Sequence, residues 1–204
     1  MKKGIFITFE GAEGSGKSTQ IKNAARFFRR KDRSVVLLRE PGGTKVSEAI
    51  RAILLDKRNK KLSDATELFL YLAARSQIVR EKILPALKKG KVVICDRFED
   101  STLAYQGYGR KLPFALIRDM NRVVRGTLKP MLTFVLDVDI RRGLQRGGRY
   151  DRIERESFSF HQRVRSGFLK LAEQEPERMT VIDGSRPLPE VSRLVLEKLK
   201  SVFG

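Results

Sequence analysis

The stretch Gly11-Ala12-Glu13-Gly14-Ser15-Gly16-Lys17-Ser18 matches the phosphate-binding loop pattern G-x-x-x-x-G-K-[ST] at every specified position. The apolar run before it, Ile5–Phe9, is typical of a buried strand. After it, apolar residues recur at helical spacing: Ile21, Ala24, Ala25 and Phe28. The context predicts a strand–loop–helix unit, in which backbone N–H groups and the positive end of the helix dipole surround phosphate oxygens.

The pattern also assigns roles to individual side chains of the loop. Lys17 reaches the β- and γ-phosphates of a nucleoside triphosphate, and the Ser18 hydroxyl ligates Mg²⁺. A glycine turn with a chance lysine is the alternative, and the strand and helix on either side argue against it. We expect nucleotide contacts from Gly11, Ala12, Glu13, Gly14, Ser15, Gly16, Lys17, Ser18 and Thr19.

The composition fits one domain, residues 1–204, of a soluble protein. Hydrophobic residues make up 41% of the chain and charged residues 33%. No apolar run approaches the roughly 18 residues of a membrane span, and Ile5–Phe9 is too short for a signal peptide. The single cysteine, Cys95, excludes an internal disulfide and is compatible with a reducing cytosol. We therefore expect a cytoplasmic protein without a membrane partner.

The formal net charge of +19 raises the question of a nucleic-acid partner. The basic residues are spread along the whole chain in short blocks, with no basic tail and no zinc-finger spacing. A solvated, lysine-rich surface of the thermophile kind is one explanation, and a field that attracts small polyanionic substrates is another. We expect a mixture of these two rather than specific binding of nucleic acid.

Five short apolar runs predict strands: Ile5–Phe9, Ser34–Leu38, Val92–Cys95, Met131–Val138 and Met179–Ile182. Long helical patterns lie between them. This alternation predicts an α/β three-layer sandwich of the P-loop NTPase type, with a five-stranded parallel sheet flanked by helices. The longest helical pattern is Leu62–Lys89, with Ser63 as its expected N-cap and Pro85 expected to kink or end it.

Polar motifs follow the predicted strands, where an open parallel sheet binds its ligands. They are Arg39-Glu40-Pro41-Gly42-Gly43-Thr44, Asp96-Arg97, Asp137 with Asp139, and Asp183-Gly184. A glycine- and arginine-rich segment, Arg146–Arg152, lies between two helical patterns. It suits a short mobile lid, at about residues 144–157, that closes over an anion.

Two of these motifs carry a family resemblance. Asp96–Gly107, DRFEDSTLAYQG, resembles the D-R-[YFH]-x-x-S-x-x-A-Y-Q-G signature of thymidylate kinases, and Arg39–Thr44 resembles the R-E-P-G-G-T of the same family. Leu70–Arg75 is similar to its thymine-binding helix, and Asp151–Phe158 to the end of its lid. The resemblance implies transfer of the ATP γ-phosphoryl group to dTMP in dTTP biosynthesis, with Mg²⁺, by a homodimer.

Phosphoryl transfer requires two anions to be held in line while their repulsion is screened. Arg97 directly follows a strand and is the first candidate for the acceptor phosphate, with an ion pair to Asp96 or Glu99 as the alternative. Arg39 and Arg51 are further candidates, and Arg51 is equally compatible with a solvated helix face. Asp96 ends an apolar strand beside the P-loop, so we expect it to bind Mg²⁺ through water; a helix N-cap is the alternative.

The resemblance assigns the remaining acceptor contacts. Tyr71 stacks on thymine and Arg75, one helical turn later, binds its O4, while Thr102 and Gln106 read the base edge and Tyr105 crowds the sugar 2′ position. Glu13 faces the acceptor 3′-hydroxyl. Simple packing is the alternative for the aromatic and base-edge residues. The expected substrate contacts are Glu13, Arg39, Pro41, Arg51, Tyr71, Arg75, Arg97, Ser101, Thr102, Tyr105 and Gln106.

The resemblance also concerns the lid. One type of thymidylate kinase carries its transition-state arginine in the P-loop after the acidic residue, and here Gly14 occupies that position. We therefore expect the lid-arginine type, in which Arg149 or Arg152 closes on the transferred phosphoryl group and Arg146 contacts adenine. The expected catalytic residues are Lys17, Arg97, Arg149 and Arg152.

Two other functions remain open from the sequence. A kinase of the same fold with another small-molecule acceptor would keep the chemistry, and a basic P-loop ATPase would act on nucleic acid. The lone residues His161, expected on a helix surface, and Cys95, expected in a buried strand, receive no role.

Overall fold

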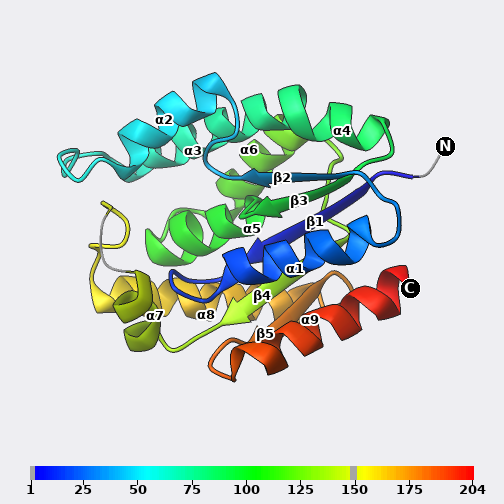
Figure 1. Ribbon diagram of the computed structural model, residues 1–204. Coiled ribbons are helices and arrows are strands. Elements are labelled where there is room, and N and C mark those ends of the chain that lie inside the picture. Colours follow the sequence, from blue (N-terminus) through cyan, green and yellow to red (C-terminus); the bar gives the residue numbers. More distant parts are fainter. Residues whose placement is uncertain (1–2, 148–150) are drawn as a thin grey trace.

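The structure is a computed structural model that describes residues 3–147 and 151–204. Five strands form one parallel sheet in the order β2-β3-β1-β4-β5 (Figure 1). The strands are β1 (Ile5–Glu10), β2 (Val35–Arg39), β3 (Val92–Asp96), β4 (Leu132–Asp137) and β5 (Met179–Asp183). The predicted five-stranded parallel sheet is confirmed, and no strand boundary differs from its prediction by more than one residue.

Helices cover both faces of the sheet, so the predicted three-layer α/β sandwich is also confirmed. α1 and α9 lie on one face, and the long α3–α4 segment and α8 lie on the other (Figure 1). The helices are α1 (Lys17–Arg29), α2 (Lys45–Leu55), α3 (Asp64–Ile78), α4 (Leu84–Lys88), α5 (Glu99–Thr102), α6 (Phe114–Arg125), α7 (Ile140–Gly147), α8 (Phe158–Gln174) and α9 (Leu188–Phe203), with π-helical turns η1 (Val79–Ile83) and η2 (Leu103–Gly109).

Strand β1 distributes its side chains between the two faces. Ile5, Ile7 and Phe9 pack with α1 and α9, whereas Phe6 packs with the η1–α4 segment. Because side chains alternate along a strand, Glu10 shares the face of Phe6 and points toward the start of α5. The last residue of the strand is therefore a buried carboxyl directly before the phosphate-binding loop.

The loop itself requires glycine where β1 ends. Gly11 has a φ of +128°, and a Cβ at this position would lie 2.4 Å from the Leu136 carbonyl oxygen. Only glycine tolerates both this φ and this close approach. The chain then enters α1 at Lys17, which confirms the predicted strand–loop–helix unit.

Two expectations about helices need correction. Ser63 caps α3 as predicted, but Pro85 does not end the long segment: α3 passes through the π-helical turn η1 into α4, which ends at Lys88. Pro85 is the second residue of α4, directly after the π-helical turn η1, so the hydrogen-bonding pattern changes just before the residue that lacks an N–H. His161 is 1% exposed and packs edge-on against Phe160, so it is not a surface residue.

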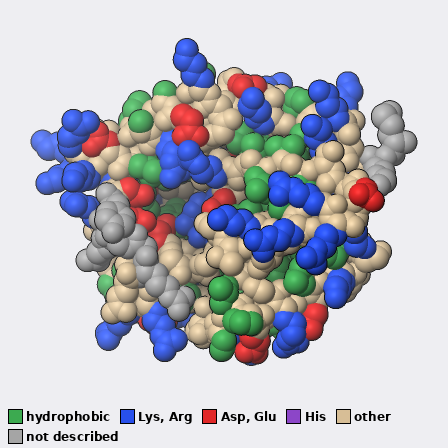
Figure 2. Space-filling model, in the orientation of Figure 1, with side chains coloured by type: hydrophobic (Ala, Val, Ile, Leu, Met, Phe, Trp, Pro, Cys, Tyr) green, Lys and Arg blue, Asp and Glu red, His purple; other side chains and the backbone are tan. Residues whose placement is uncertain are grey.

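The positive charge is distributed over the surface. Figure 2 shows Lys and Arg side chains spread across the visible face, with one group over the connection between α2 and α3. The exposed cations of that connection are Lys57, Arg58, Lys60 and Lys61. None of the helices formed by residues 3–147 and 151–204 is long and apolar enough to span a bilayer.

Candidate active site

A cavity of about 170 Å³ lies beside the phosphate-binding loop. Of the predicted acceptor contacts, all except Arg39 line it. Its lining residues are Glu13, Glu40, Pro41, Arg51, Leu55, Tyr71, Arg75, Arg97, Ser101, Thr102, Tyr105, Gln106, Asp151, Ile153 and Glu154. The tertiary structure therefore brings together residues from six separate segments of the chain.

Arg97 joins this cavity to the phosphate-binding loop. Its Nη1 donates to the Gly11 carbonyl oxygen at 3.0 Å and to Ser101 Oγ at 3.2 Å. Its Nη2 pairs with Glu13 Oε1 at 2.8 Å. The ion pair is with Glu13 and not with Asp96 or Glu99, the partners weighed from the sequence. The Arg97 backbone has a φ of +70°, which places the side chain against the loop.

Glu13 is held in its ionised form. Burial raises the pKa of Glu13, but the charges of Arg97 and Lys17 and the hydrogen bond from Tyr105 outweigh burial and leave the pKa below its ordinary value. The Tyr105 hydroxyl lies 2.8 Å and 2.9 Å from the two Glu13 oxygens. A carboxylate facing the cavity between two donors can orient a sugar hydroxyl or a water molecule.

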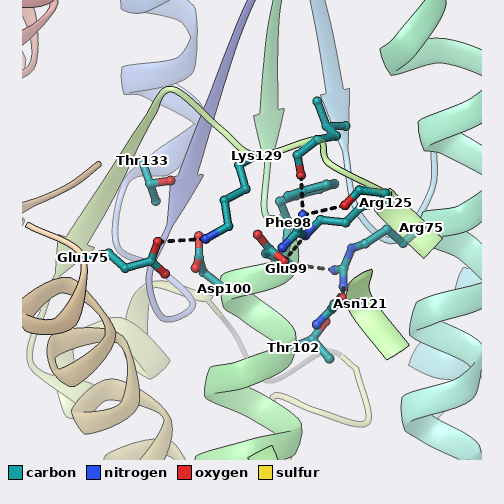
Figure 3. Close-up of polar contacts among 12 residues, drawn as sticks. Arg75, Phe98, Glu99, Asp100, Thr102, Asn121, Arg125, Lys129, Thr133 and Glu175 are labelled. Atoms are coloured by element: carbon teal, nitrogen blue, oxygen red, sulfur yellow. Dashed lines mark hydrogen bonds and ion pairs between the residues drawn. The ribbon is translucent and has the colours of Figure 1, made fainter. Parts of the chain in front are cut away.

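Arg75 is one of the largest side chains that are completely buried. Its Nε pairs with Glu40 Oε2 at 2.7 Å. Its Nη1 donates to Thr102 Oγ1 and Asn121 Oδ1, both at 2.7 Å, as Figure 3 shows, and its Nη2 donates to the Phe98 carbonyl oxygen at 2.9 Å. Among the residues that the structure describes, these bonds use four of its five N–H groups and leave one, on Nη2, for a ligand in the cavity.

Tyr71 lies one helical turn before Arg75 on α3 and is half-buried in the cavity wall. Burial raises the pKa of Tyr71, and the negative charge of Glu67 raises it further. The hydroxyl therefore stays protonated and the ring stays neutral, as stacking on a base requires.

Lys17 lies folded over the phosphate-binding loop. Its Nζ donates to the carbonyl oxygens of Gly11 at 3.1 Å and Ala12 at 2.9 Å. Burial, and then the positive charge of Arg97, lower the pKa of Lys17 to about 8, although the negative charges of Asp96, Glu13 and Glu10 raise it. A phosphate that displaced these weak carbonyl contacts would stabilise the ammonium form.

The chemistry of two side chains fits Mg²⁺. Among the described residues, Asp96 Oδ1 is buried without a hydrogen-bond partner, at the end of the strand that neighbours β1. Ser18 is exposed at the second position of α1. Mg²⁺ needs only one or two protein oxygens beside phosphate and water, so these two residues suit it. The alternative N-cap role of Asp96 does not apply, because Phe98 precedes α5.

The sequence reasoning missed Glu10. Its Oε1 accepts from the Phe98 N–H at 2.7 Å and its Oε2 from Ser101 Oγ at 2.6 Å, so it fixes the turn that carries Arg97. Burial, and then the negative charge of Asp100, raise the pKa of Glu10 to about 8. The raised pKa disfavours a negative charge on Glu10, directly before the phosphate-binding loop. In the sequence, the position of Glu10 directly before the phosphate-binding loop is the signal that could have identified it.

Glu67 was missed as well. This buried carboxylate accepts from Gln106 Nε2 at 2.8 Å and from Arg110, and it pairs with Arg152 at 2.7 Å. Burial raises the pKa of Glu67, but Arg110, Gln106 and Arg152 outweigh burial and lower it. Arg152 also donates to the Leu54 carbonyl oxygen at 2.9 Å. This residue of the expected lid is thus bound to α2 and α3, not to the phosphate-binding loop.

The other predicted contacts are divided between the cavity and the remaining surface. Arg51 lines the cavity and donates to the Pro41 carbonyl oxygen at 2.9 Å. Arg39 lies outside the lining, with its Nη2 3.0 Å from both oxygens of Glu48. Arg149 and the side chain of Arg146 fall outside the described part of the chain, and their roles stay predictions.

A parallel sheet with a P-loop after its central strand, beside a cavity into which three arginines (Arg51, Arg75 and Arg97) project among carboxylates, is typical of a P-loop phosphotransferase. A family model described as thymidylate kinase matches residues 9–195. The thymidylate kinase of Geobacter sulfurreducens is 50% identical over 96% of both chains, and that of Geotalea uraniireducens is 49% identical over 94% of both. A crystal structure of thymidylate kinase from Ehrlichia chaffeensis superposes with a TM-score of 0.79 at 36% identity, covering 97% of this chain and 99% of the other.

The chain belongs to the thymidylate kinase family. It is accordingly an ATP-dependent nucleoside monophosphate kinase, and the resemblance found in its motifs is confirmed over nearly the whole chain.

The raised pKa of Glu10 predicts a loss of stability with increasing pH. The folded-state pKa of about 8 exceeds the ordinary value of 4.5, so the native state holds the extra proton between these values. The stabilisation is full at low pH and is lost as pH rises through about 8. The groups facing Glu10 are Asp100, Arg97 and Lys17.

Urea unfolding at pH 5.5 and 8.5 measures this effect. Glu10→Gln mimics the neutral carboxyl, so we expect wild type to lose a few kcal/mol more than the variant over this range, since one pKa unit corresponds to about 1.4 kcal/mol. Equal pH dependence of the two proteins would show that Glu10 does not titrate in this window.

Proposed function

We propose that the chain transfers the γ-phosphoryl group of ATP to dTMP, giving ADP and dTDP, with ATP on the phosphate-binding loop and dTMP in the cavity. The observation that carries this proposal is the Arg97–Glu13 pair, which belongs to both places at once. Two nucleotides bound on either side of this pair have their phosphates next to each other, as in-line transfer requires.

The donor site consists of the loop amides and Lys17. The backbone N–H groups of residues 11–18 and the start of α1 bind the β- and γ-phosphates, with Lys17 turned from the loop carbonyls toward them. Ser18 and Asp96 would hold Mg²⁺, which would supply positive charge to offset the charge of the phosphates during transfer.

The acceptor site places the dTMP phosphate near Arg97 and Arg51 and the base near Tyr71 and Arg75. Arg75 offers its remaining N–H to a base carbonyl, and Tyr71 offers a ring face. Gln106 and Thr102 border the base edge. Tyr105, held by Glu13, lies against the sugar and disfavours a ribose 2′-hydroxyl.

The transition-state arginine is proposed to come from the lid, because Gly14 occupies the alternative position in the loop. Arg149 and Arg152 are the candidates. Arg152 would have to leave Glu67 and the Leu54 carbonyl oxygen to reach the phosphates, and Arg149 lies outside the described residues.

A homodimer is proposed through α2, α3 and α6, which lie side by side on the outer surface (Figure 1). Large apolar side chains are exposed on each: Val46 and Ile53 on α2, Phe69 on α3, and Leu116 and Val123 on α6. Val123 is 72% exposed and Phe69 is 55% exposed, which is a large apolar surface for adjacent helices to leave in water.

Release of ADP with dTMP as acceptor tests the reaction directly, with dCMP, dGMP and UMP as comparisons. We expect dTMP to be used at least about 100-fold better, because a buried arginine that binds a base carbonyl discriminates strongly between bases. Arg97→Ala should lower kcat/KM for dTMP by about 100-fold or more while ATP binding remains. If the protein preferred another monophosphate, the assignment of dTMP as the acceptor would be wrong, while the assignment of the ATP site would be unaffected.

Single lid variants test the arginine assignment. Arg149→Ala or Arg152→Ala should lower kcat by about 10³-fold, the contribution of an arginine that binds the transferred phosphoryl group. Arg142→Ala, an exposed arginine of α7, serves as the matched control and should leave kcat unchanged. The assignment is wrong if both lid variants turn over normally.

Sedimentation velocity at micromolar concentration tests the dimer. Phe69→Asp buries a charge in the proposed interface and should yield monomers. Leu188→Asp alters an exposed apolar residue of α9, outside that surface, and should remain dimeric. Wild type that sediments as a monomer would refute the proposed assembly.

A further inference from the structure

A second cavity, of about 480 Å³, lies between α6 and the carboxyl end of α8, with α5 at its base. We call it the α6–α8 cleft. It shares no lining residue with the cavity beside the phosphate-binding loop. Leu103 is its only large apolar lining residue, so the described lining suits a polar occupant.

The three carboxylates of the α6–α8 cleft are all paired with cations. Glu99 pairs with Arg125, and Asp100 pairs with Arg178 at 2.8 Å. Glu175 pairs with Lys129 at 3.2 Å and also with Arg178 at 3.1 Å. Figure 3 shows the Lys129–Glu175 pair beside Asp100 and the Glu99–Arg125 pair next to it. Their negative charge is therefore neutralised within the protein.

Two arginines of the cleft remain without a carboxylate partner among the described residues. The Arg118 side chain contacts the Gln174 side-chain oxygen at 3.4 Å, and the Arg122 side chain makes no polar contact within residues 3–147 and 151–204. Both are exposed. With Arg125 they follow the spacing i, i+4, i+7, so they share one face of α6, separate from the face that carries Leu116 and Val123.

We propose that the α6–α8 cleft binds a small polyphosphate, either free or as the triphosphate group of a nucleotide. Planar guanidinium groups one helical turn apart can bind neighbouring phosphates in bidentate fashion, and every carboxylate of the described lining is already paired with a cation. The cleft volume accommodates a group of this size. Because Arg118 and Arg122 take no part in the proposed phosphoryl transfer, the site is separate from the donor and acceptor sites.

Calorimetric titration with sodium tripolyphosphate at 150 mM NaCl tests the proposal. The phosphate-binding loop also binds tripolyphosphate, so the titrations use the Lys17→Ala protein, in which that competing site is disabled. We expect one equivalent to bind, and Arg118→Ala/Arg122→Ala in the same background to weaken binding at least about tenfold. Titration with ATP and dTTP then separates a free polyphosphate from a nucleotide as the ligand.

The matched control is Arg29→Ala/Arg30→Ala in the Lys17→Ala background, which removes the same charge from an exposed place at the end of α1. Binding in this control should equal that of Lys17→Ala alone. Absence of binding to Lys17→Ala overturns the proposal, and so does equal weakening in the two arginine pairs, which would show attraction by net charge only. Neither result depends on whether dTMP is the acceptor.

Discussion

The Arg97 side chain is the contact on which the active site depends, because it crosses from the strand that precedes α5 to the phosphate-binding loop. It donates to the Gly11 carbonyl oxygen and pairs with Glu13, and Glu10 fixes the turn that presents it. The phosphate-binding loop and the cavity that we propose for the acceptor are thereby tied to each other. Phosphoryl transfer depends mainly on such positioning.

Buried ion pairs surround this contact. Arg75 pairs with Glu40, Arg110 with Glu67, and Arg178 with Asp100. Removing one partner from such a pair is costly, about 3–5 kcal/mol, whereas the intact pair contributes little net stability. These pairs therefore specify the arrangement of α3, α5 and η2 around the cavity more than they stabilise the fold.

The same ion pairing helps to explain where the net charge of +19 lies. Many arginines are occupied by internal carboxylates, and the excess lies on the surface, where Figure 2 shows it dispersed. Dispersed positive charge attracts nucleotides from solution without selecting among them. In the function that we propose, selection between nucleotides depends on Arg75, Gln106 and their neighbours in the cavity.

Local sequence patterns determined the five strands, their parallel arrangement, the phosphate-binding loop and the Ser63 cap, since each depends on residues that are neighbours in the chain or at a regular spacing. The motifs also identified most residues of the cavity. The course of the chain through Pro85 and the burial of His161 depended on tertiary packing that no local pattern reports.

Only the tertiary structure decided which residues pair with the charged side chains of the active site. Arg97 could have paired with Asp96 or Glu99, which are closer in sequence, yet it pairs with Glu13, 84 positions away. Glu10 and Glu67 carry no motif of their own, and their importance arises from the donors that distant segments bring to them. Ion pairs form between whichever charges the fold buries together, so a linear pattern can name the charged residues of a site but cannot assign their contacts.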